Sequence, residues 1–163
     1  MRRERGFTLV ELLVVIIILG ILLAVAIPRY FQGIEQAKIN TYCATIHNIK
    51  MAIEVYRATN DPSYTYPPDP TGPLPKYLSD WIATDWGNPF SDYFDSAPKD
   101  PFTGNVFRVT NNISDVTDTS IIVYTTTGNY YSLPPFKYYT LLFIDPTNPI
   151  SPPTPRSFVT ECR

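Results

Sequence analysis

The fold of this chain is decided by residues 2–31, which read RRERGFTLVELLVVIIILGILLAVAIPRYF. Arginines open the stretch, and a nearly continuous apolar run from residue 7 to residue 27 follows them. At about 1.5 Å per helical residue, this run reaches roughly 30 Å, which is enough to cross a bilayer. One acidic residue, Glu11, lies inside the run, and a charge at the centre of a membrane helix costs roughly 2.5–3.5 kcal/mol. A partner for Glu11 is therefore needed.

Three interpretations of this segment are open. A cleaved secretory signal fits the basic start and the AVA of residues 24–26, but the apolar run is long for a signal and Glu11 has no purpose there. A plain single-pass anchor with a cytoplasmic N-terminus leaves Glu11 unpaired. In the third interpretation the chain is cut after Gly6, which gives Phe7 a free amine. The Glu11 carboxylate of a neighbouring copy then pairs with that amine and sets the stagger between subunits.

The hexapeptide GFTLVE of residues 6–11 resembles the class III leader of type IV pilins and type II secretion pseudopilins, with basic residues before it and an apolar run ending at Pro28 behind it. The resemblance implies that a prepilin peptidase cuts after Gly6 and methylates Phe7, and that Glu11 sets the stagger. It also implies an inner-membrane precursor, an assembly machinery in that membrane, and a homo-oligomeric helical filament outside the cell.

Gly20 and Pro28 bracket a stretch of weak helix, because glycine costs about 1 kcal/mol relative to alanine and proline lacks an N–H group. We expect a kink at Pro28, and melting of residues 20–28 on assembly. A kinked but continuous helix is the alternative for a single subunit.

Residues 29–60 change to an amphipathic helical pattern, which predicts a helix lying on a core rather than in lipid. The lone histidine, His47, lies off the apolar stripe and is interpreted as a surface residue. The stripe consists of Ile39, Tyr42, Ile46, Ile49, Ile53 and Tyr56.

These patterns divide the chain into a leader at 1–6, a transmembrane and filament-core helix at 7–28, the amphipathic half of that helix at 29–60, and a β-rich domain at 61–163. Prolines at 61–75 predict an irregular loop at the start of this domain.

Two similar phrases follow, DWGNPF at 85–90 and DPFTGNVF at 100–107. Each predicts a turn that enters a strand, with Gly87 and Gly104 at positive φ. The first phrase resembles the D-P-W-G-N-P-Y of major pseudopilins, although the proline after the aspartate is absent here.

Alternating residues predict strands at 105–110, 120–126, 130–133 and 138–144, with a tight turn at 127–129. Short links favour antiparallel pairing. The expected fold class is α+β: a pilin fold in which the N-terminal helix has a protruding apolar half and packs its other half on an antiparallel sheet.

Cys43 and Cys162 are the only cysteines, and no CxxC motif is present. Haem attachment and a Cys/His zinc site are therefore not expected. If the domain leaves the cytoplasm, one disulfide would join them; two free buried thiols are the alternative.

Asp92, Asp95 and Asp100 are the candidates for a calcium site, but no complete ligand motif surrounds them, and solvated loop acids are the alternative. We expect neither cofactor nor catalysis, because no nucleophile–base pair stands out. The formal net charge of −2 does not favour nucleic acid as the main partner.

The leading hypothesis is a structural subunit of an extracellular type IV pilus-like filament. The main alternative is a type II secretion pseudopilin. A minor pilin that acts as an adhesin or binding module, and a secreted protein with an ordinary signal peptide, are further alternatives.

Overall fold

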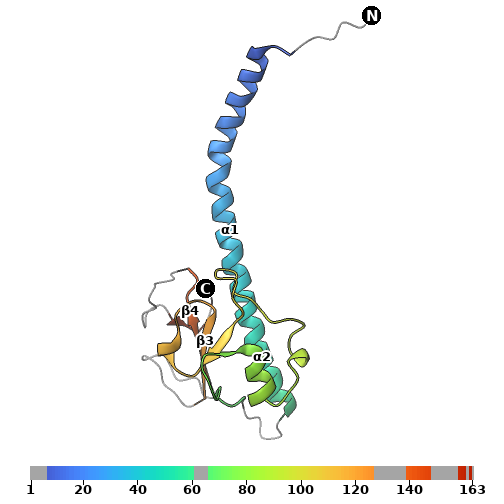
Figure 1. Ribbon diagram of the computed structural model, residues 1–163, viewed down its shortest axis with the longest axis vertical. Coiled ribbons are helices and arrows are strands. Elements are labelled where there is room, and N and C mark those ends of the chain that lie inside the picture. The colour runs from blue at the N-terminus through green and yellow to red at the C-terminus, as the bar shows by residue number, and fades with distance from the viewer. Residues whose placement is uncertain (1–6, 61–65, 127–138, 148–157, 161, 163) are drawn as a thin grey trace, which may run out of the picture. The chain divides into compact units, whose positions relative to one another are not determined.

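The computed structural model describes residues 7–60, 66–126, 139–147, 158–160 and 162. The chain divides into two compact units, Met1–Ala37 and Lys38–Arg163, called here the N-terminal and C-terminal units. The long helix α1, Leu9–Asn60, contributes to both units (Figure 1).

In the N-terminal unit, α1 is helical at every residue from Leu9 onward, including Gly20 and Pro28. The single chain therefore has the continuous helix that was the alternative to a melted 20–28 stretch. Melting on assembly stays a prediction. Every described residue of this unit is exposed, and α1 is the one helix in the described part of the chain that is long and apolar enough to cross a membrane.

The C-terminal unit contains a five-stranded sheet in the order β1-β2-β3-β4-β5. Three of its four strand pairs are antiparallel, but β2 and β3 run parallel, so the prediction of a wholly antiparallel sheet is wrong. The link between β2 and β3 carries a 3₁₀ helix at Ile113–Asp115 and is long enough to return the chain to its starting end. The strands are Lys76–Tyr77, Arg108–Thr110, Ile121–Thr125, Thr140–Ile144 and Phe158–Val159.

The predicted strands at 105–110, 120–126 and 138–144 correspond to the central β2, β3 and β4. The predicted strand 130–133 and turn 127–129 lie outside the described residues. The two-residue strands β1 and β5 were not predicted.

A short helical stretch after β1 was also not predicted. It comprises α2, Leu78–Asp80, and a π-helical segment, Trp81–Asp85, and it covers part of the core (Figure 1). A second unpredicted turn of 3₁₀ helix follows at Phe90–Asp92.

The core of the C-terminal unit forms where the apolar stripe of α1 packs on the sheet. The stripe prediction is confirmed at its centre, because Tyr42, Ile46, Ile49 and Ile53 are buried. The Tyr42 ring lies 5.7 Å from that of Phe107, and its hydroxyl donates a 3.0 Å hydrogen bond to the Thr119 carbonyl. This burial raises the Tyr42 pKa far above its ordinary value. The remaining buried apolar side chains include Leu78, Trp81, Ile82, Val109, Ile122, Tyr124, Leu141 and Phe143.

Candidate assembly site

The N-terminus of α1 is closed by a reciprocal pair of side chains, Thr8 and Glu11. The Glu11 Oε2 atom accepts hydrogen bonds from the Thr8 N–H and the Thr8 hydroxyl, each at 2.8 Å. In return, the Glu11 N–H donates to the Thr8 hydroxyl at 3.3 Å. This is a capping box, which satisfies backbone donors that the first helical turn leaves unpaired. The signal for it, Thr-x-x-Glu, was present in the sequence but was not interpreted in this way.

The structure places the Glu11 carboxylate at the start of the helix, and the sequence alone suggested a charge inside a membrane span. Glu11 lies in the first turn of α1, where the helix dipole favours an anion, rather than in the middle of a span. Its second oxygen, Oε1, accepts no hydrogen bond from the described residues. Phe7, four residues earlier, is 74% exposed. Gly6 lies outside the described residues.

Gly20 and Pro28 lie on an exposed helix surface in this unit. A Cβ atom added at Gly20 would meet nothing within 4 Å, so close packing inside the chain does not require glycine there. Just after Pro28, the rings of Tyr30 and Phe31 are 68% and 60% exposed. The roles of Gly20 and Pro28 in assembly remain predictions.

Cys43 and Cys162 form a disulfide with their Cα atoms 5.7 Å apart, which confirms the predicted bond. The bond ties the end of the chain to α1 across 119 residues. Close by, the Lys50 amine donates a hydrogen bond to the carbonyl of Thr160. The terminal strand β5 is thus held to the helix as well as to β4.

The loop after residue 99 is organised by Asp100, which is fully buried. Its carboxylate accepts hydrogen bonds from the Phe102 N–H at 3.0 Å and from the hydroxyls of Thr103 and Thr119 at 2.6 Å each. Gly104 closes the loop with φ at 76°, as predicted, and Gly87 has φ at 70° in the matching phrase.

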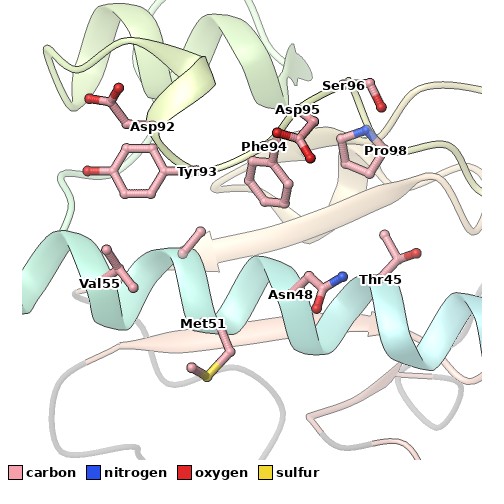
Figure 2. A pocket seen from close by; sticks show the side chains of 11 residues that line it. Thr45, Asn48, Met51, Val55, Asp92, Tyr93, Phe94, Asp95, Ser96 and Pro98 are labelled. Atoms are coloured by element: carbon pink, nitrogen blue, oxygen red, sulfur yellow. The ribbon is translucent and has the colours of Figure 1, made fainter.

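The three calcium candidates do not come together. Asp92 and Asp95 are exposed and line a groove of about 470 Å³ beside α1 (Figure 2), which Asp100 does not reach. In the part of the chain that the structure describes, no group of three or more His, Cys, Asp or Glu side chains could hold a metal ion. Asp100 instead holds its own loop.

One polar cluster fixes the helical stretch that follows β1. Lys76 Nζ lies 2.8 Å from Asp85 Oδ2, and the Thr71 hydroxyl donates to Asp85 Oδ1 at 2.6 Å. Burial opposes ionisation of Asp85, but the hydrogen bonds from Lys76 and Thr71 outweigh it and lower the pKa of the carboxyl group. This cluster stabilises the domain and lies apart from the N-terminal segment in sequence.

Comparison with known proteins agrees with these features. The family described as the prokaryotic N-terminal methylation motif matches residues 1–27. Type II secretion system core protein G of Pseudomonas aeruginosa is 35% identical over 118 residues, which cover 62% of this chain and 80% of that protein. Core protein G of Vibrio cholerae is 31% identical, covering 67% of this chain and 82% of that protein.

Pilins are also similar to this chain, over a shorter part of it. The type IV narrow pilus major component PilA5 of Thermus thermophilus is 42% identical over 53 residues, which cover 32% of this chain and 46% of that protein. No solved structure matches.

A capped, apolar N-terminal helix joined to an α+β domain fits a membrane-anchored subunit. The chain belongs to the family of type IV pilins and type II secretion pseudopilins. It is a family of structural subunits, which a prepilin peptidase processes and which assemble into filaments.

Proposed function

We propose that this chain is the structural subunit of a helical filament whose core is built from the helices of residues 7–28. After cleavage behind Gly6 and methylation of Phe7, the amine of Phe7 in one copy pairs with the Glu11 carboxylate of its neighbour. The precursor is anchored in the inner membrane, and the processed subunit leaves the membrane when it is added to the filament.

The observation that carries this proposal is the exposed apolar surface of the N-terminal unit. Its large hydrophobic side chains are about half exposed or more, from Leu9 to Phe31. A contiguous apolar surface of this extent is unfavourable in water and must be covered by lipid or by other protein. In a bundle of identical helices, the neighbouring copies cover it.

The capping box explains how the Glu11 carboxylate can be satisfied both in the membrane-bound precursor and in the assembled helix bundle. In the precursor, Thr8 satisfies Oε2 of Glu11 at the start of the helix. In the bundle, the remaining oxygen, Oε1, is available to the ammonium group of Phe7 from another copy. Breaking a buried ion pair of this kind by removing one partner costs about 3–5 kcal/mol, so the pair favours one stagger over all others.

The test is the Glu11→Ala variant. We expect normal insertion in the membrane, measured by membrane fractionation, and loss of nearly all assembled subunits, measured by chemical crosslinking of subunits in intact cells. Glu35→Ala is the matched control, because Glu35 is an exposed acid on the same helix, and this variant should assemble normally. Normal filaments from Glu11→Ala would contradict the pairing, and a mature N-terminus other than methylated Phe7 would contradict the processing.

The comparisons with known proteins favour a type II secretion pseudopilus over a type IV pilus. Likeness to core protein G extends over four-fifths of that protein, whereas likeness to the pilin PilA5 extends over less than half of it. We therefore infer that a short pseudopilus of a type II secretion system is the first candidate, and a long type IV pilus the second. Deleting the gene and measuring both protein secretion and surface filaments separates them, because a pseudopilin deletion blocks secretion and a pilin deletion removes long surface filaments.

A further inference from the structure

A groove runs along the solvent side of the C-terminal unit, between α1 and the segment of residues 92–98 (Figure 2). Its volume is about 470 Å³, within the range of sites that hold a ligand or a few side chains. Figure 2 shows the Phe94 ring pointing from that segment toward α1, with the Asp95 carboxylate beside it.

The helix side of the groove is apolar and open to solvent. Met51 and Val55 line it and are 51% and 42% exposed, whereas the apolar residues Ile46, Ile49 and Ile53 of the same helix are buried. Phe94 and Pro98 add apolar surface from the opposite side. Exposed apolar surface in a groove favours a partner that brings an aromatic or aliphatic side chain.

Two carboxylates, Asp92 and Asp95, give the groove its charge. Both are exposed, and neither side chain forms an ion pair or hydrogen bond with another described residue. Other acids of this unit are already engaged, as Asp85 is with Lys76 and Asp118 with Arg108. The groove therefore fits a cation that is carried next to an apolar group.

We propose that this groove receives the segment Arg29-Tyr30-Phe31 from a second copy of the chain, an inference that rests on the filament function proposed above. Arg29 is exposed and forms no ion pair with the described residues. The rings of Tyr30 and Phe31 are 68% and 60% exposed and lie edge to face, 6.1 Å apart. The segment combines a cation and two exposed aromatic rings, which complements the groove.

The two parts of the contact reinforce one another. A guanidinium group is planar and pairs with carboxylates through two hydrogen bonds, so Arg29 matches Asp92 and Asp95 better than a lysine would. An exposed ion pair alone is weak. An aromatic ring seated against Val55 and Phe94 excludes water beside the pair and adds a favourable ring–ring contact.

The position of Arg29 links this contact to the filament core. The segment follows Pro28 directly, so it begins where the proposed core helix of residues 7–28 ends. Before assembly, an arginine and two aromatic residues at the end of an apolar span suit the membrane interface. On leaving the membrane they lose that environment, and the groove of another copy replaces it.

The test reverses the charge of Arg29 and the charges of Asp92 and Asp95, separately and together, in the full-length chain expressed in cells. Arg29→Glu alone, and Asp92→Arg with Asp95→Arg, should each lower the fraction of subunits in filaments at least several-fold. Combining all three substitutions should restore most of that fraction. The controls are Lys38→Glu and Asp80→Arg, which reverse exposed charges on α1 and on α2 outside the groove and should leave assembly unchanged.

The outcomes separate this contact from the function on which it rests. If Glu11→Ala abolishes filaments while every reversed groove variant assembles like the wild type, the groove contact is wrong and the filament function stands. If the groove variants fail but the triple exchange does not restore assembly, the acids serve a different occupant and the pairing with Arg29 is overturned. If the wild-type chain forms no filament of any length, both proposals fail together.

Discussion

The two halves of α1 share one backbone conformation and differ in what surrounds them. In residues 9–37 every described side chain is exposed, whereas residues 38–60 bury one face against the sheet of their own unit. Short isolated helices are marginal in water, and packing of an apolar face usually stabilises them. The second half finds that packing within its own chain, and the first half needs lipid or other copies.

The largest test of this comparison removes the disulfide. In the chain-entropy view a bond that closes a loop of more than one hundred residues contributes about 4–5 kcal/mol to the free energy of unfolding. Cys43→Ser with Cys162→Ser should lower the unfolding free energy of the C-terminal unit by roughly this amount, measured by urea unfolding of the full chain in detergent. Membrane insertion of residues 7–28 should not change. A defect in insertion with an unchanged unfolding midpoint would contradict the division into two units.

A matched pair of isoleucines sharpens the comparison. Ile53 is fully buried and Ile16 is 57% exposed, both on α1. Ile53→Ala should cost about 2–5 kcal/mol of unfolding free energy, because it leaves a cavity in the core. Ile16→Ala should leave the same measurement unchanged within error and reduce filament yield instead. Equal losses of domain stability from both variants would show that the two halves are not independent.

Alanine substitutions at two glycines should have the smallest effects on stability, one destabilising the domain and the other stabilising the helix. Gly104 has φ at 76°, a conformation that costs other residues about 1–2 kcal/mol. Gly20 is helical with open space around it, where alanine is favoured by about 1 kcal/mol. Gly104→Ala should therefore lower the thermal midpoint of the domain by several degrees. Gly20→Ala should raise the helicity of the N-terminal unit, seen by far-ultraviolet circular dichroism in detergent.

Features set by local pattern were predicted from the sequence. The helical stripe around Tyr42 and Ile53, the positive φ of Gly104 and three central strands depend on periodicity or on one residue's backbone freedom. The disulfide followed from cysteine count and compartment. These signals lie within a few residues or in the composition, so a single sequence contains them.

Features set by distant partners were not predicted. The parallel pairing of β2 with β3 depends on where a ten-residue link returns, and β1 and β5 are too short to produce alternation. Asp100 was a calcium candidate because it is a loop acid near Asp92 and Asp95. Its burial and its hydrogen bond with Thr119, nineteen residues away, depend on the tertiary fold. The capping box of Thr8 and Glu11 is the exception: its signal, Thr-x-x-Glu, is local, but Glu11 was predicted only to pair with another copy.

The disulfide has a mechanical consequence for a subunit that is pulled along its helix. Cys43 lies on α1 shortly after the N-terminal unit, and Cys162 lies next to the end of the chain. A pull on the helix at Cys43 is therefore passed to Cys162 through a covalent bond. Separating these two residues would require breaking the bond, so a pull applied outside the loop that it closes cannot draw out the sheet inside that loop.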